Sequence, residues 1–257
     1  MLKNVTETAK EYVSELQRAE ENLIVSKHVK EFSGFRRNGI NVIGARPFVG
    51  MTEFLLSIAN ELASQGQKTM FVSTCHSTQE VIKKIIALEN GIKYTEVTNS
   101  LVAEYKPQTS NVDNIFIYEA SVNKELRITS NLIPILIENN IENLIIDAVA
   151  NNMQELLKII DYKKVTIFLG QLLGKSVDKH YWPTYKDFLK KGIEMAHVHV
   201  AIGLVRLEFY SIIMDENGDT TKGHSEIVVI KSPHENANTR YRIQQDAHFK
   251  FPDWSPE

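Results

Sequence analysis

The chain has 257 residues, of which 43% are hydrophobic, and this is enough to bury a substantial core in one α/β domain. The formal net charge of −3 gives no overall positive field that would attract nucleic acid or an anionic membrane, so any such contact would be local. The single cysteine, Cys75, excludes an internal disulfide, and no apolar run approaches the ~18 residues of a membrane span. The N-terminus lacks the apolar core of a signal peptide, so the expected compartment is the cytoplasm.

The first 34 residues predict an amphipathic helix. Apolar residues recur three or four positions apart from Val5 to Val29, with charged residues between them. Such a helix could pack on the core of its own domain, or residues 5–32 could dock as an arm on another subunit. We therefore assign residues 1–34 to an N-terminal helix and residues 35–257 to the main domain.

Strands alternate with helices from residue 40 onward. The run "INVIGA" (40–45) predicts a strand, and "MTEFLLSIANELASQG" (51–66) predicts a helix that ends at Gly66. The alternation continues through expected strands at 67–74, 114–120, 143–149 and 164–171 and expected helices at 77–91, 128–140 and 151–161. Strands and helices in this order predict a parallel sheet with helices on both faces.

The last part of the chain, residues 197–251, is rich in strand patterns and contains a turn at "DENGD". We expect it to add an antiparallel extension to the sheet. His197 and His199 alternate along an expected strand there, and without a third ligand at a useful spacing they are interpreted as ordinary strand histidines.

The stretch "GARPFVGMT" (44–52) lies between the first strand and its helix, where a phosphate-binding P-loop, G-x-x-x-x-G-K-[ST], would lie. Gly50 and Thr52 are in register with this motif, and Gly44 stands one residue before the place of its first glycine. In the motif, backbone N–H groups approach the phosphates and the hydroxyl ligates magnesium. Met51 replaces the lysine that bridges the outer phosphates. Methionine can neither neutralise phosphate charge nor donate a hydrogen bond.

Two polar residues end apolar strands further along the chain, Asp147 in "NLIID" and Gln171 in "VTIFLGQ". Because the carboxyl ends of parallel strands meet at one edge of a sheet, Thr52, Asp147 and Gln171 are expected to converge there. A carboxylate in this place can reach the water shell of a magnesium ion. An aspartate that leaves a strand is also a common turn residue, so the pattern alone allows both interpretations.

Residues 35 to 254 resemble the C-terminal RecA-like motor domain of DnaB-type replicative helicases. "IGARPFVGMTEFLLSIANELA" resembles the P-loop and first helix of that family, "NLIIDAVANNM" its Walker B region and "VTIFLGQLLGKS" its polar sensor strand. "HSEIVVIKSPHEN" resembles its late hairpin, which reaches the nucleotide of a neighbouring subunit, and "FKFPDW" its aromatic chain end. The resemblance implies a RecA-like P-loop fold with a mostly parallel sheet. It also implies a Mg-ATP site formed by Gly44, Arg46, Gly50, Thr52, Asp147, Gln171 and Lys231, with Thr52 and Asp147 at the magnesium.

The chain departs from that family at three positions that handle charge. Met51 stands in place of the P-loop lysine, Cys75 in place of the glutamate that activates water, and Pro233 in place of the arginine finger. An arginine finger alone is worth about 10³ to 10⁵ in rate. We therefore expect a degenerate member of the family, a pseudo-ATPase that binds Mg-ATP weakly or not at all.

The function expected from this resemblance is a binding or assembly module linked to DNA replication or a mobile element. Residues 5–32 would mediate self-association or contact with a replication protein. The alternatives are an active ATP-dependent helicase with displaced catalytic groups and a regulator that binds a partner without nucleotide. Basic and aromatic residues in 173–192 could contact single-stranded DNA, or could form a solvated loop. The candidates for DNA contact are Lys175, Lys179, Trp182 and Lys186.

Overall fold

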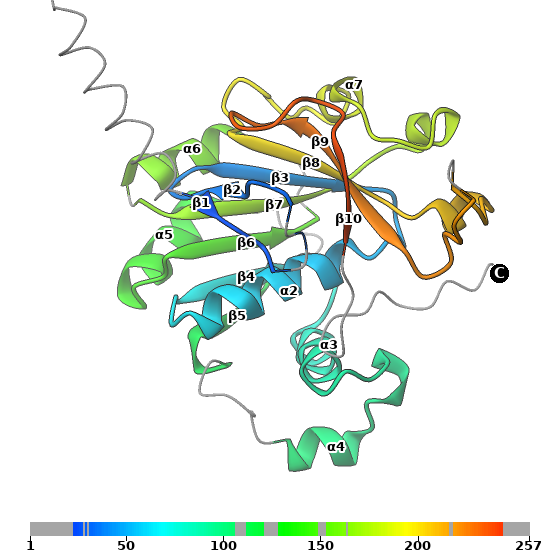
Figure 1. Ribbon diagram of the computed structural model, residues 1–257. Helices are drawn as coiled ribbons and strands as arrows, with labels where there is room; N and C mark the ends of the chain where they lie inside the picture. Colours follow the sequence, from blue (N-terminus) through cyan, green and yellow to red (C-terminus); the bar gives the residue numbers. More distant parts are fainter. Residues whose placement is uncertain are drawn as a thin grey trace, which may run out of the picture.

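A mixed sheet of eight strands forms the centre of the molecule (Figure 1). The structure, a computed structural model, describes residues 23–27, 29, 31–105, 112–120, 128–148, 153–162, 164–215 and 218–243. The strands are β3 (Ile40–Ala45), β4 (Thr69–Ser73), β5 (Ile115–Glu119), β6 (Asn143–Asp147), β7 (Thr166–Leu172), β8 (Val200–Val205), β9 (Ser225–Lys231) and β10 (Arg240–Ile243). Their order across the sheet is β10-β9-β8-β3-β7-β6-β4-β5. The strands from β8 to β5 pair in parallel, and β9 and β10 pair antiparallel at the other edge, which confirms the predicted fold class.

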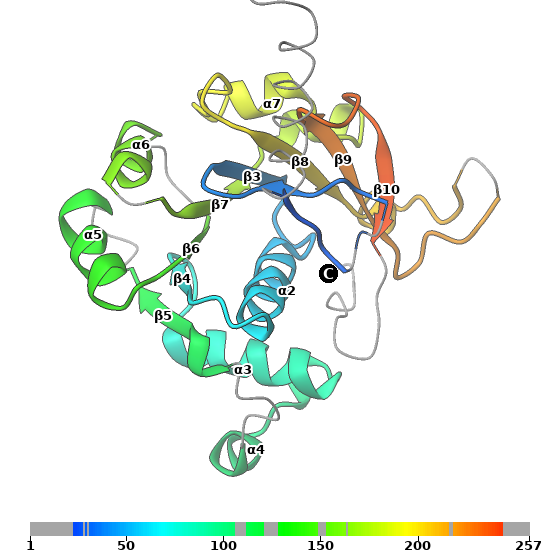
Figure 2. The ribbon, with the colours of Figure 1, turned by 60° about the vertical axis from the view of Figure 1, so that its left-hand side comes forward.

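Helices cover both faces of this sheet (Figure 2). The α-helices are α2 (Met51–Ser64), α3 (Thr78–Asn90), α4 (Asn99–Glu104), α5 (Ile128–Glu138), α6 (Met153–Tyr162) and α7 (Tyr185–Leu189). Short 3₁₀ segments are η1 (Tyr94–Glu96), η2 (Val112–Asn114), η3 (Lys175–Lys179) and η4 (Leu207–Tyr210). Two hydrophobic layers result, one that contains α2 and α3 and one that contains α5, α6 and α7. No helix in the described ranges is long and apolar enough to cross a membrane.

Local sequence signals explain where the helices begin and end. The hydroxyl of Ser77 accepts from the backbone N–H of Glu80, whose side chain accepts from the N–H of Ser77, so a capping box starts α3. Gly91 ends α3 in a left-handed conformation, with φ 61°. These boundaries agree with the helix predicted over 77–91.

The prediction of a helix through residue 34 is wrong for its described part. Leu23–Ile24 forms β1, which pairs antiparallel with β2 (Phe35–Arg36). Gly34 allows this reversal, because it has φ +115° and an added Cβ would lie 2.6 Å from the carbonyl oxygen of Ile24. Phe32 is buried in the domain core, so this segment belongs to the main domain. Residues 1–22, with most of the expected arm, lie outside the described residues, as does the aromatic chain end.

The two histidines also differ from the prediction, because β8 begins only at Val200. His197 lies in a turn, with Nε2 3.6 Å from a carboxylate oxygen of Glu194. The Nδ1 atom of His199 accepts a hydrogen bond from the N–H of Ile40 at 3.2 Å. Among the described residues, no three His, Cys, Asp or Glu side chains are arranged to hold a metal ion.

Candidate functional site

The loop between β3 and α2 has the backbone shape that presents N–H groups to an anion. Phe48 and Gly50 take left-handed conformations, with φ 66° and 101°, and the 14-residue helix α2 starts directly afterwards. The positive end of the helix dipole and the unpaired N–H groups of the first turn favour negative charge at this point. Phe48 lies on this loop, and 78% of its surface is exposed. The sequence pattern gave no indication of this exposed aromatic residue.

Gly44 is closely packed against a side chain of the core. An added Cβ at this position would lie 2.4 Å from Cζ of Phe188, which is fully buried. Phe188 comes from α7, so the glycine allows α7 to lie against β3.

Thr52 and Asp147 meet at the carboxyl edge of the sheet, as predicted. The hydroxyl of Thr52 donates to Oδ2 of Asp147 at 2.9 Å. Asp147 is 1% exposed, and its Oδ1 has no hydrogen-bond partner within the described residues. Burial raises the pKa of the Asp147 carboxyl, and the hydrogen bond from Thr52 opposes this rise.

Gln171 also lies at this edge, at the end of β7. Its Nε2 donates to the carbonyl of Leu172 at 3.1 Å, while its buried Oε1 has no partner among the residues described. Hydroxyl, carboxylate and amide oxygens are the ligands that a hard cation such as magnesium takes. Thr52, Asp147 and Gln171 at this edge therefore offer oxygen atoms of the kinds that fit magnesium or its water shell.

Met51 is part of the hydrophobic core. It is 5% exposed and packs in the same hydrophobic layer as Leu55 and Phe168. A Cβ added to Gly170 of β7 would lie 3.1 Å from Cε of Met51, so the methionine side chain lies against the sheet. The residue at the lysine position therefore fills core space beneath the loop.

The side chain of Arg46 extends from the loop and binds residues 173 and 178, in and just before η3. Its Nε and one terminal nitrogen donate to the two carboxylate oxygens of Asp178, at 2.8 and 3.2 Å. The other terminal nitrogen donates to the carbonyl of Leu173 at 3.0 Å. This bidentate pair fastens the loop to η3 and occupies the guanidinium.

Cys75 follows β4 at the same edge of the sheet and is exposed. Thr74 connects it to the site, because the Thr74 hydroxyl donates to the carbonyl of Asp147 at 2.5 Å and lies 3.6 Å from Sγ of Cys75. Cysteine offers no carboxylate oxygen at this place. His76, the neighbour of Cys75 in the sequence, is near enough for its charge to lower the pKa of Asp147.

Lys231 and Pro233 lie away from the other site residues. Lys231 ends β9 and pairs with Ala201 near the start of β8, so it lies at the amino edge of the parallel strands. Its Nζ donates to the carbonyl of Met195 at 2.7 Å. Pro233 is exposed in the turn that follows β9. Within one chain, Lys231 therefore does not join Thr52 and Asp147.

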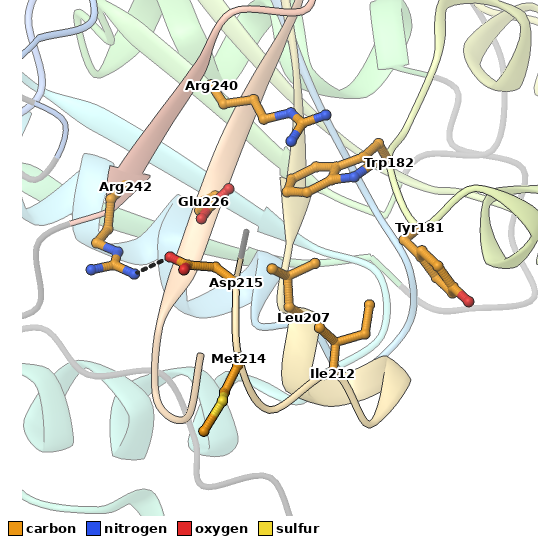
Figure 3. A pocket seen from close by; sticks show the side chains of 9 residues that line it. All are labelled: Tyr181, Trp182, Leu207, Ile212, Met214, Asp215, Glu226, Arg240 and Arg242. Carbon is orange, nitrogen blue, oxygen red and sulfur yellow. Dashed lines mark ion pairs between the residues drawn. The ribbon is translucent and has the colours of Figure 1, made fainter. Parts of the chain in front are cut away.

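The residues predicted to contact DNA separate into two groups. Lys175, Lys179 and Lys186 are exposed on η3 and α7, which are joined by a hydrogen bond from Ser176 to Asp187. Trp182 instead lines a cavity of about 390 Å³, and the guanidinium of Arg240 lies over its ring, 3.9 Å from the centre (Figure 3). One face of the indole is therefore already covered.

Comparisons with known proteins agree with this fold. Among solved structures, one described as an ATPase domain superposes with a TM-score of 0.72 at 16% identity, over 99% of this chain and 100% of that one. A DnaB-like replicative helicase, solved in a study of its interactions with primase, gives a TM-score of 0.71 at 17% identity, over 94% of this chain and 64% of that one. At these identities both structures support the fold alone, and the search of curated proteins found no match.

The sequence profile described as DnaB-like helicase C terminal domain matches residues 26–163, more than half of the chain. The matched range contains the loop, Thr52 and Asp147, and it ends before Gln171 and the late hairpin. The chain therefore belongs to the DnaB-like helicase C-terminal domain family.

Proposed function

We propose that this chain is a degenerate DnaB-like protein that does not hydrolyse ATP efficiently. It acts in the cytoplasm as a binding or assembly module linked to DNA replication or a mobile element. The observation that carries the proposal is the burial of Met51, which is 5% exposed and packed against the sheet. A lysine that bridges phosphates needs its charge in the loop, and here the corresponding side chain is a core residue.

Two positive charges, one on the loop and one on α3, are engaged with carboxylates. Arg46 is bound to Asp178, and Lys84 of α3 is paired at 2.5 Å with Glu53, in the first turn of α2. A bound nucleotide would be held by the backbone N–H groups of the loop, with magnesium at Thr52, Asp147 and Gln171. Magnesium would supply charge neutralisation for the phosphates when bound. We expect weak Mg-ATP binding from these contacts.

A steady-state ATPase assay on purified protein tests the proposal. We expect turnover near background, because neither a water-activating carboxylate nor an arginine finger is present at the matching positions. Magnesium-dependent turnover comparable to that of a working helicase, abolished by Asp147→Ala, would contradict the proposal. Titration calorimetry with Mg-ATP then measures whether nucleotide binds.

We also propose that the N-terminal segment mediates self-association or binding to a replication protein. The core position of Phe32 limits how this can be tested, because a deletion through residue 32 would also damage the domain. Removal of residues 1–22 leaves β1 and β2 intact. If light scattering gives the same oligomeric mass after this deletion, the segment is not the self-association arm.

Single-stranded DNA is a further proposed partner, at the exposed lysines of η3 and α7. Replacement of Lys175, Lys179 and Lys186 by glutamine should weaken oligonucleotide binding, because each lysine can neutralise a backbone phosphate. Arg240→Gln is the control, since this cation is engaged over Trp182. Equal affinity in the triple variant and the wild type would exclude this surface.

A further inference from the structure

A cavity of about 390 Å³ lies beside β9 and β10, the last two strands at one edge of the sheet (Figure 3). Its walls come from parts of the chain that are far apart in the sequence, namely residues 181–182 before α7, residues 207–215 after β8, and the two strands. Ligand pockets in proteins have volumes of about 300–1,000 Å³. The cavity therefore has the size for one small molecule.

One side of this cavity is apolar and is held in place by the core. Leu207 and Ile212 line it, and both are part of or packed against the hydrophobic layer that contains α5, α6 and α7. Trp182 lines the same side, and its neighbour Pro183 packs tightly on β8, since a Cβ added to Gly203 would lie 2.6 Å from the proline ring. This side offers a flat aromatic ring and aliphatic side chains to an apolar group.

The opposite side of the cavity is charged (Figure 3). Glu226 of β9 and Arg242 of β10 are directly paired across the two strands, and Arg242 lies 3.6 Å from a carboxylate oxygen of Asp215. Arg240 completes this side, with its guanidinium 3.9 Å from the centre of the Trp182 ring. Two carboxylates and two guanidinium groups therefore line the cavity, and their charges sum to zero.

The two sides together indicate the chemistry of a ligand. Because the charges of the lining balance, a zwitterion preserves the balance, whereas a ligand with one charge disturbs it. The 3.6 Å between Arg242 and Asp215 is longer than a hydrogen bond, so a carboxylate on the guanidinium and an ammonium on Asp215 can each make a shorter contact. The apolar side requires a large apolar group on the same molecule.

We propose that this cavity binds an α-amino acid with a large apolar side chain. The carboxylate of the amino acid pairs with Arg242, and its ammonium pairs with Asp215. Its side chain lies against Trp182 and the aliphatic residues beside it. The residues that line the cavity do not include Thr52 or Asp147, and this inference does not rest on the proposed function.

Titration calorimetry with L-phenylalanine and two analogues tests the proposal. Phenethylamine lacks the carboxylate of phenylalanine, and 3-phenylpropanoate lacks its ammonium. Each analogue should bind about tenfold or more weakly than L-phenylalanine, because each loses hydrogen bonds between charged groups. Absence of binding of L-phenylalanine at millimolar concentrations, or equal affinity for all three compounds, would overturn the proposal.

Two variants assign the charged groups of the ligand to side chains of the protein. Arg242→Gln should weaken L-phenylalanine about tenfold or more without weakening phenethylamine, which has no carboxylate. Asp215→Asn should weaken L-phenylalanine to a similar degree without weakening 3-phenylpropanoate, and the asparagine oxygen can still accept from the N–H of Asp219. The control is Arg37→Gln, which removes a positive charge from a side chain bonded to Gln67. If Arg242→Gln weakens L-phenylalanine and phenethylamine equally, or if the control has the same effect, the assignment is wrong.

A measurement on the unmodified protein avoids dependence on variants that fail to fold. The chain has two tryptophans, so the indole N–H signal of Trp182 in an NMR spectrum is identified by its absence in Trp182→Phe. L-phenylalanine should shift this signal, and glycine, a zwitterion without an apolar side chain, should shift it less at the same concentration. An indole signal that does not move during the titration with L-phenylalanine would refute the site.

Discussion

Met51→Lys tests whether the residue at the P-loop lysine position is now part of the core. Met51 opens α2 and is 5% exposed, with its terminal methyl directed toward Gly170. A lysine of similar length must either place its ammonium among apolar side chains or turn toward the loop. The second course leaves the space above Gly170 unfilled.

The expected loss in the free energy of unfolding has two parts, the lost burial of the methionine and the added cation at the start of α2. Loss of the buried methionine side chain removes about 1.5–3 kcal/mol of stabilisation. An added cation at the positive end of α2 costs about 0.3–1 kcal/mol more. We therefore expect the free energy of unfolding to fall by about 2–4 kcal/mol. Met51→Leu, which conserves volume, should cost less than about 1.5 kcal/mol.

Urea denaturation of both variants measures this difference, and calorimetry with Mg-ATP measures the gain in affinity that a cation in the loop should give. Turnover should stay near background in Met51→Lys, because Cys75 and Pro233 are unchanged. If Met51→Lys unfolds at the same urea concentration as Met51→Leu, Met51 does not have the core role that we assign to it. If it hydrolyses ATP like a working helicase, the argument for lost catalytic charge fails.

Three further substitutions test the surroundings of the site. Gly170→Ala should destabilise the fold by about 1–3 kcal/mol in urea, because its Cβ would lie 2.8 Å from Leu55 and 3.2 Å from the backbone of Ala148; an unchanged midpoint would contradict this packing. Asp147→Asn should stabilise the protein at pH 7 and have little effect near pH 4. A raised folded-state pKa means that the native state binds more protons than the unfolded state, so the stability of the wild type falls as pH rises above the unfolded pKa of about 3.9. A difference in stability between Asp147→Asn and the wild type that does not change with pH would disprove this. Arg46→Gln should cost about 1–3 kcal/mol through loss of the pair with Asp178, and no change in thermal midpoint would show that the pair contributes nothing.

Most of the fold could be predicted because local and tertiary signals agree. The alternation of strands and helices indicated the parallel sheet, and Ser77, Glu80 and Gly91 indicated the limits of α3. The prediction failed at residues 23–34, where apolar residues spaced three or four apart serve a turn and a short hairpin. The close approach of Gly34 to Ile24 decides that conformation, and periodicity contains no information about such a contact.

The site was predictable where sheet topology alone determines position. Thr52 and Asp147 are 95 residues apart, yet parallel strands bring them to one edge. The roles of Arg46 and Trp182 were not predictable in this way. Arg46 binds Asp178, 132 residues away, and Trp182 lies beneath Arg240 from β10. These pairings depend on how η3 and the late strands pack, and the motif spacing does not encode this.

The two halves of the site differ in what holds them in place. Met51 stabilises the fold by its burial, so packing alone accounts for it. Asp147 is different, because a buried polar atom without a hydrogen bond costs about 1–3 kcal/mol and its Oδ1 has no partner among the described residues. Packing does not account for that carboxylate, whereas a bound cation would satisfy it. The edge of the sheet thus combines a buried carboxylate that packing does not explain with a buried methionine that packing explains in full.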